Sequence, residues 1–173
     1  MRNKWFHRLA AVLLLFAAQP AIAAVTNTPI FPQTLKNTKT CYVQGTDTAG
    51  TYKTIYTGGA NGSKIVAIWA GTNDDVSHLV IVRHSSSTSD HCATNGTCSS
   101  GAAVTVAASS GYAASTPVIN MVSTTNWPGL PADTDGNPFM FLSDNTQTIE
   151  ATFATAFSTA GEHVCFNVIG SDF

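Results

Sequence analysis

Residues 65–70 read IVAIWA and residues 79–82 read LVIV, two short stretches without a charged or hydroxyl-bearing side chain. Both are rich in β-branched residues, which favour extended strands over helices. A strand that is apolar at every position, rather than at every second one, is typically covered on both faces or placed in the middle of a sheet. We therefore predict two central strands, at residues 64–71 and 78–84, with Trp69 in the core.

Six further segments have strand character and are separated by clusters of Gly, Asn, Asp and Pro, which favour turns. They cover residues 51–57, 102–107, 117–122, 139–142, 146–153 and 163–169. In the last segment Val164, Phe166 and Val168 occupy alternate positions, which predicts that one face of that strand lies in the core. No segment shows an apolar stripe at helical spacing. We therefore expect an all-β, single-domain β-sandwich or jelly-roll-like fold with about 8–9 short antiparallel strands.

The N-terminus has the three parts of a secretory signal peptide. Three basic residues lie within the first eight positions, residues 9–18 are apolar, and residues 21–23 read AIA, a cleavage signal of small residues. The apolar run is shorter than the roughly 20 residues that a membrane-spanning helix needs. We therefore expect residues 1–23 to be removed, no membrane span, and a secreted, periplasmic or cell-surface location.

The residues that follow the signal peptide are acidic and poor in helix-forming side chains. Residues 24–173 keep all ten acidic residues but only five of the eight Lys and Arg, and they contain only four Leu. So few positive side chains exclude a basic surface for nucleic acid, because such a surface needs many phosphate contacts.

Residues 24–40 are set apart by their composition. Pro29 and Pro32 exclude a helix interior, so we predict an extended N-terminal arm or an edge strand, followed by the sandwich domain at residues 41–173. An extended segment of this kind can add a strand to the sheet of a neighbour. We therefore expect a protein partner or self-association through this arm.

Four cysteines in an exported chain are most simply two disulfides, for which three pairings are open. We favour Cys92–Cys98, because Asn95 and Gly96 between them form a strong turn signal. The remaining pair, Cys41–Cys165, would join the two ends of the domain. In the chain-entropy model, closing a loop of that length is worth about 4–5 kcal/mol.

Titratable side chains are too few and too dispersed to predict a catalytic site or a cofactor. His84 and His91 flank a Ser-rich loop and could meet, but no Gly-x-Ser-x-Gly motif accompanies the serines near them. Asp74 and Asp75 are adjacent in a turn, which predicts a solvated tip rather than a paired acid and base. We expect a protein that is not an enzyme.

Asp133, Asp135 and Asn137 occupy the first three ligand positions of a calcium loop. The loop then requires Gly at its sixth position and Glu at its twelfth, where this chain has Pro138 and Asp144. A tight turn before a strand therefore accounts for this segment, and we expect no bound metal.

Two aromatic residues are candidates for contact with a ligand or partner. Trp127 lies in the loop sequence NWPG at residues 126–129, and Tyr112 follows a Gly outside the predicted strands. An exposed Trp127 beside the Cys92–Cys98 loop would suit a glycan. This supports an alternative function as a secreted adhesin or carbohydrate-binding module, with a pilin-like surface subunit as a variant.

The order of several segments resembles a family of small β-rich structural proteins from the virions of tailed bacteriophages. The likeness lies in YTGGANGSKI at residues 56–65, NDDVSHLVI at 73–81, TPVINM at 116–121, LPADTDGNPF at 130–139, and the ending from AGEHV at 160–164 to GSDF at 170–173. It covers about 120 residues, from 51 to 173. It implies a capsid- or tail-associated assembly component without catalytic residues. Because this chain adds a predicted signal peptide, we expect an exported relative that acts as a non-enzymatic structural or assembly protein.

Overall fold

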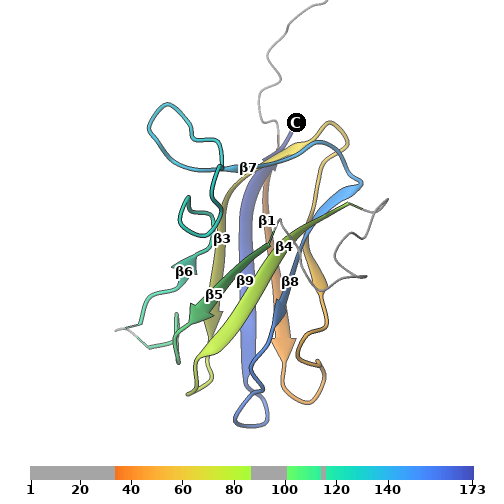
Figure 1. Ribbon diagram of the computed structural model, residues 1–173. Coiled ribbons are helices and arrows are strands. Elements are labelled where there is room, and N and C mark those ends of the chain that lie inside the picture. Colours follow the sequence, from red (N-terminus) through yellow and green to blue (C-terminus); the bar gives the residue numbers. More distant parts are fainter. Residues whose placement is uncertain (1–33, 87–100, 114–115) are drawn as a thin grey trace, which may run out of the picture. The chain divides into compact units, whose positions relative to one another are not determined.

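The computed structural model describes residues 34–86, 101–113 and 116–173, which form nine β-strands in two antiparallel sheets (Figure 1). The strands are β1 (Thr34–Val43), β2 (Lys53–Thr57), β3 (Ser63–Thr72), β4 (His78–Ser86), β5 (Gly101–Val106), β6 (Ile119–Asn120), β7 (Met140–Leu142), β8 (Gln147–Phe153) and β9 (His163–Asp172). Each of the eight predicted segments contains a strand, which confirms the all-β sandwich. Within the described ranges, no helix is long and apolar enough to cross a membrane.

The two predicted central strands lie in the interior of different sheets. Sheet A has the order β1-β9-β3-β6, with β7 also pairing to β3, and sheet B has the order β2-β8-β4-β5. β3 therefore lies between β9 and the two short strands β6 and β7, and β4 lies between β8 and β5 (Figure 1). Their apolar character is thus explained by their position inside a sheet.

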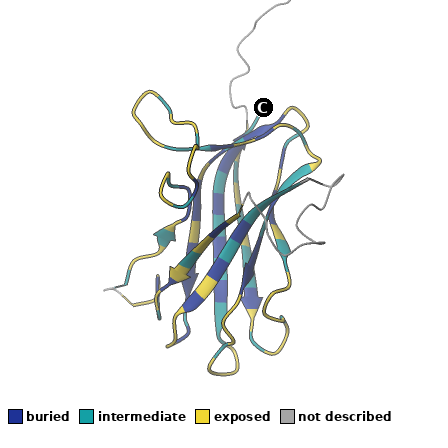
Figure 2. Ribbon diagram, viewed as in Figure 1, coloured by how far each residue is buried: buried dark blue, intermediate teal, exposed yellow. Residues whose placement is uncertain are grey.

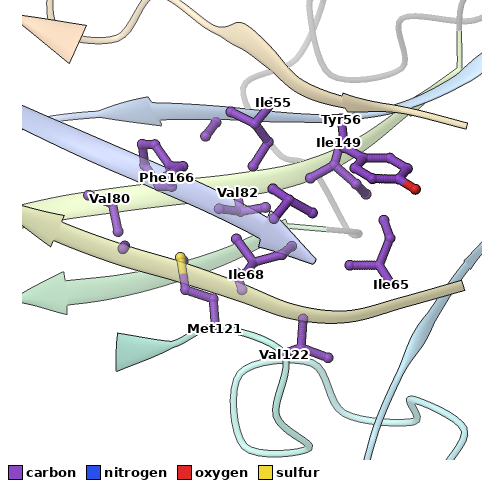
Figure 3. Packing of buried hydrophobic residues seen from close by; sticks show 14 of the residues in the cluster. Ile55, Tyr56, Ile65, Ile68, Val80, Val82, Met121, Val122, Ile149 and Phe166 are labelled. Carbon is purple, nitrogen blue, oxygen red and sulfur yellow. The ribbon is translucent and has the colours of Figure 1, made fainter. Parts of the chain in front are cut away.

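The core fills the space between the two sheets, where apolar side chains from both meet (Figure 3). On β9, Val164, Phe166 and Val168 are fully buried and alternate with half-buried residues, as Figure 2 shows and as the sequence predicted. Val80 and Val82 enter the core from β4 on the opposite sheet. Burial of such side chains provides the main driving force for the fold, at about 25 cal/mol for each Å² of apolar surface removed from water.

Trp69 does not lie in the core, so that prediction is wrong. Its neighbours Ile68 and Ala70 are fully buried, and because side chains alternate along a strand, Trp69 points to the other side of sheet A. There it is 38% exposed. The run is apolar on both faces although only its inner face is fully covered.

A disulfide joins Cys41 on β1 to Cys165 on β9, the pairing that the sequence favoured. The two residues are directly opposite each other in the β1–β9 ladder, with their Cα atoms 4.1 Å apart, and their sequence separation is 124. The bond ties an edge strand to its neighbour. The second predicted pair, Cys92–Cys98, and the predicted signal peptide at residues 1–23 lie outside the described residues.

Side chains of β1 also fasten sheet A to sheet B. Tyr42 is fully buried, and its hydroxyl donates a hydrogen bond to the carbonyl of Ala151 on β8. The same oxygen accepts a hydrogen bond from the backbone N–H of Lys53 on β2, at 2.7 Å. The ring of Tyr42 also packs against two other aromatic rings, with centroid distances of 5.2 Å to Phe153 and 6.1 Å to Phe166. Tyr42 thus connects three strands across the edge of the sandwich.

The segment predicted as an arm or edge strand is only partly described. Residues 34–40 form the first part of β1, which lies at the edge of sheet A, and residues 24–33 lie outside the described residues. Within β1, Thr38 Oγ1 donates to the carbonyl of Ile55 on β2 at 2.6 Å. This part of the chain is therefore held against its own domain.

Candidate functional site

The side of sheet A that faces away from the core carries large apolar side chains that remain accessible to water. One row of paired residues across this side contains Leu35, Ser171, Lys64 and Phe141. Leu35 is 89% exposed and Phe141 is 55% exposed. The name outer apolar face is used below for five exposed residues on this side: Leu35, Trp69, Tyr112, Val118 and Phe141. These side chains follow the length of β9 from the row of Ser171 to His163, and we take this side of sheet A as the candidate surface for contact with a partner.

Tyr112, predicted as a contact residue, is held on this face by the strand beneath it. It is 57% exposed, and its hydroxyl lies 2.5 Å from Nε2 of His163 on β9. The two rings meet edge to face with centroids 5.4 Å apart. Gly71 on β3 allows the loop to lie this close, because a Cβ there would approach the carbonyl oxygen of Ser110 to 2.7 Å. Tyr112 therefore presents an ordered aromatic surface.

A hollow of about 290 Å³ lies beside β3 on the same side of sheet A. Its lining comes from β3, from β6 and the residues that follow it, and from the loop that precedes β7, which lie next to one another in Figure 1. The residues that line it include Val66, Asn120, Val122, Asp133, Asn137 and Phe139. The hollow thus combines an apolar wall with two amides and a carboxylate.

The residues predicted as a partial calcium loop form a turn that their own hydrogen bonds close. Asp133 Oδ1 accepts hydrogen bonds from the backbone N–H groups of Asp135 at 3.0 Å and Asn137 at 2.8 Å. Its Oδ2 accepts one from Asn137 Nδ2 at 3.3 Å. The bond from the Asn137 backbone contributes most to lowering the pKa of Asp133 below its usual value. Because the side-chain nitrogen of Asn137 donates to Asp133, the segment is a polar turn closed by its own hydrogen bonds.

Asp74 and His78 form a fully buried pair at one end of β4. His78 Nε2 lies 2.8 Å from Asp74 Oδ2, and His78 Nδ1 lies 3.0 Å from the carbonyl oxygen of Thr155. A carbonyl oxygen only accepts, so Nδ1 carries a proton, while Nε2 faces the carboxylate of Asp74. Burial by itself raises the pKa of Asp74, but hydrogen bonds from Val76, Ser158 and His78 outweigh burial and hold that pKa well below its usual range. Both ring nitrogens of His78 are therefore engaged in hydrogen bonds inside the fold, and the pair is fully buried.

The prediction of a solvated tip at Asp74 and Asp75 is correct only for Asp75, which is exposed. Ser158 approaches from a distant part of the chain, with its Oγ 2.8 Å from Asp74 Oδ1, 2.7 Å from Asp75 Oδ1 and 2.9 Å from Glu162 Oε2. The three acidic groups offer oxygens within 4.8 Å of one another. Since Asp74 is already committed to His78 and Ser158, we assign no metal to this cluster. In the sequence, the four-residue spacing of Asp74 and His78 is the signal that could have indicated this pair.

Trp127 is not an exposed contact residue. It is 8% exposed and belongs to the core, next to the buried residues that follow β6. The chain turns back at this point, since the backbone N–H of Trp127 donates to the carbonyl of Ser123 at 2.9 Å. The loop sequence around Trp127 is therefore on the surface while its indole ring is not.

The predicted meeting of His84 with His91 falls on a segment that is not described. His84 lies on β4, and its buried Nε2 has no hydrogen-bond partner among the described residues. His91, and Asp90 beside it, lie outside the described residues. The described part of the chain thus assigns no proton-transfer role to His84.

Comparison with known proteins gives little similarity. No protein-family model matches the chain, and no curated protein matches it. Among solved structures, it is similar to a chain described as "Cyanophage Pam1 capsid asymmetric unit", with 13% sequence identity, a TM-score of 0.37, and coverage of 90% of this chain and 99% of that one. Similarity at this level leaves the function to be argued from the chain's own residues.

Proposed function

We propose that this chain is a secreted, non-enzymatic structural or assembly protein that associates with further copies of itself through the outer apolar face. The observation that carries this proposal is the exposure of Leu35, Trp69 and Phe141 on one side of sheet A. Covering such side chains with a partner is favourable by about 25 cal/mol for each Å² of apolar surface removed from water. Association therefore lowers the free energy, because it covers apolar side chains that the isolated chain leaves in contact with water.

Charge favours a second copy of the same chain as the partner. Among the strand residues that face this side of sheet A, the charged ones are Lys39 and Lys64, both positive. Residues 24–173 as a whole contain ten acidic and five basic side chains. Asp133 lies close to Lys64, so Lys39 is the positive charge that this side of sheet A can place against the acidic remainder of another copy. Contact between two unlike surfaces is heterologous, and such contacts build rings or filaments.

The described part of the predicted arm favours association through the face over strand addition by that arm. Residues 34–40 are already paired with β9. Thr38 and Lys36 in this segment also donate to the carbonyl groups of Ile55 and Thr57 on β2. These residues are therefore engaged within their own domain and are not available to add a strand to the sheet of a neighbour.

The cysteines favour a location outside the cytoplasm. Residues 1–23 have the pattern of a cleavable signal, and the Cys41–Cys165 bond belongs to a class of cross-link that forms and persists in oxidising compartments. Mass spectrometry of the protein recovered from the medium or periplasm tests this directly. We expect an intact chain that begins at Ala24, and recovery of the uncleaved chain from the cytoplasm would contradict export.

The test of assembly compares the wild-type chain with variants of two exposed faces by light scattering coupled to gel filtration. We expect the wild type to form oligomers and the Leu35→Glu/Phe141→Glu variant to elute as a monomer with an unchanged melting temperature. Leu79→Glu is the control, because Leu79 is an exposed residue on a different strand, β4 in sheet B. A wild type that stays monomeric at high concentration would refute the proposal, as would a control that dissociates the oligomer equally. If the chain associated only with a different protein, that protein would be the partner in place of a second copy.

The alternative of a glycan-binding module that acts through Trp127 is not proposed further, because the indole ring is buried.

A further inference from the structure

The hollow beside β3 lies outside the outer apolar face as defined above, and its size suits a small ligand. Its volume of about 290 Å³ is at the lower limit of small-molecule sites, which occupy roughly 300–1,000 Å³. A site of this size accommodates a single ring with its substituents rather than an extended chain. The chemistry of the lining residues decides which kind of ring it fits.

One wall of the hollow is apolar and fixed in place. The β3–β9 ladder has a bulge between Ile65 and Ala67, and this irregularity leaves Val66 facing the hollow, where it is 44% exposed. Phe139 lies on the same wall, with the ammonium group of Lys64 4.4 Å from its ring centroid. Phe139 is also packed edge to face against Phe141, with centroids 5.0 Å apart, which orients its ring. This wall can accept the C–H face of a small ring.

The polar part of the lining comes from two amide side chains, Asn120 and Asn137, whose orientations are fixed by hydrogen bonds to neighbouring residues. Asn120 Oδ1 accepts hydrogen bonds from the backbone N–H groups of Ile68 at 3.2 Å and Val122 at 3.1 Å. Its Nδ2 is then left as a donor without a partner among the described residues. Asn137 Nδ2 is bonded to Asp133, which leaves Asn137 Oδ1 as an acceptor. Fixed donors and acceptors beside an apolar wall suit a molecule that carries several hydroxyl groups, since each hydroxyl both donates and accepts.

The charges around the hollow balance. Asp133 contributes one carboxylate, and Lys64 lies close enough to attract it. Three N–H groups already bond the carboxylate of Asp133, so it offers a cation few free positions. The ammonium of Lys64 is likewise placed over Phe139. Neither a cation nor an anion finds an unpaired charge here, so a neutral ligand is favoured.

We propose that this hollow binds one neutral sugar residue, with the C–H face of the sugar on Val66 and Phe139 and its hydroxyl groups on Asn120 and Asn137. Binding at a single site of this kind gains strength when several subunits of an assembly present it together. The proposal goes beyond self-association, because it concerns what an assembled surface can hold.

Saturation-transfer NMR observed on the sugar tests the site in the full chain, whatever its state of association. The probes are glucose, galactose, mannose and N-acetylglucosamine, with sialic acid and calcium chloride as charged comparisons. We expect transfer to at least one neutral sugar without calcium. Asn120→Asp keeps the oxygen that bonds Ile68 and Val122 but removes the amide donor, so it should weaken binding roughly tenfold without lowering the melting temperature. Phe139→Leu should weaken binding as well, and Tyr112→Leu, which replaces an exposed aromatic residue outside the hollow, is its control.

Three outcomes would overturn the proposal. The first is no transfer to any of the neutral sugars at the highest concentration. The second is transfer that depends on calcium or is strongest for sialic acid, since either would assign the hollow to a charged ligand. The third is equal binding by the wild type, Asn120→Asp and Phe139→Leu, which would place the sugar elsewhere on the chain. None of these readouts depends on whether the chain forms oligomers, so this test and that of assembly can fail separately.

Discussion

Replacement of Tyr42 by Phe removes a single oxygen atom that holds the two sheets together at their β1–β2 edge. The hydroxyl donates to the carbonyl of Ala151 and accepts from the N–H of Lys53 at 2.7 Å. Lys53 and Ala151 are themselves opposite each other in the β2–β8 ladder, so the hydroxyl is inserted where β2 meets β8. The variant keeps the ring and its contacts with Phe153 and Phe166. Its effect therefore reports on the hydrogen bonds alone.

The expected loss follows from the burial of these groups. A buried donor or acceptor that loses its partner costs about 1–3 kcal/mol. Here one of each is affected, but Lys53 is only half-buried, so we expect Tyr42→Phe to lower the free energy of unfolding by about 2–3 kcal/mol, in the lower part of the summed range. For a chain of this size, that corresponds to a fall of roughly 5–10 °C in melting temperature. Alkaline pH gives a second readout, because burial raises the pKa of Tyr42 above its ordinary value. A group with a raised folded pKa stabilises below its unfolded pKa of about 10 and loses that contribution as the pH rises further, so the variant should lose less stability above that pH than the wild type.

Urea denaturation of the oxidised protein measures the difference. Tyr112→Phe is the matched control, since it removes a hydroxyl from an exposed tyrosine, and it should change the free energy of unfolding by less than about 0.5 kcal/mol. If Tyr42→Phe were no more destabilising than Tyr112→Phe, the assignment of Tyr42 as the fastener between the sheets would be wrong.

Three further predictions concern stability. Asp74→Ala should cost about 3 kcal/mol or more in urea denaturation because it leaves a buried histidine unpaired, whereas Asp75→Ala at the exposed neighbour should cost less than about 0.5 kcal/mol. The folded pKa of Asp74 is lowered, so the stability it provides is present above its unfolded pKa of about 3.9 and is lost as the pH falls below that value; an acid unfolding midpoint shared by the wild type and Asp74→Ala would contradict this. The double variant Cys41→Ser/Cys165→Ser should lose about 4–5 kcal/mol in the chain-entropy model, and an unchanged urea midpoint would show that the bond contributes nothing.

The positions of the strands could be predicted from the sequence because each is a short apolar run between turn residues. The alternation of Val164, Phe166 and Val168 also fixed which face of β9 enters the core. The pairing of Cys41 with Cys165 could be favoured because the alternative partners flank a turn. These are local signals, and a single segment carries each of them.

Errors arose where a distant segment decides the environment of a side chain. The predicted surroundings of Trp69 and Trp127 are reversed in the structure. Trp69 is half-exposed, since no described residue fully covers its side of β3, and Trp127 is buried, since its loop turns back onto the core. Asp74 is buried because Ser158 and Thr155, about 80 positions away, close over it and His78. Neither spacing nor composition near Asp74 contains that information.

The hollow could not have been found from the sequence for the same reason. Asn120 and Asn137 come from different segments, and β3 brings Val66 between them through a bulge that the sequence does not indicate. The turn at Asp133 was visible as a run of oxygen-bearing residues. The sequence does not show that this turn lies beside β3 and lines the hollow with Val66.

Hydroxyl-radical oxidation of Trp69 measures whether further copies of the chain cover the outer apolar face. After removal of residues 1–23 the chain contains two tryptophans, and Trp127 is an internal reference because it is buried in the isolated chain. If copies associate through this face, oxidation of Trp69 falls relative to that of Trp127 as the protein concentration rises and the mass in solution increases. Oxidation of Trp69 at a constant ratio to Trp127 over the whole concentration range would contradict it.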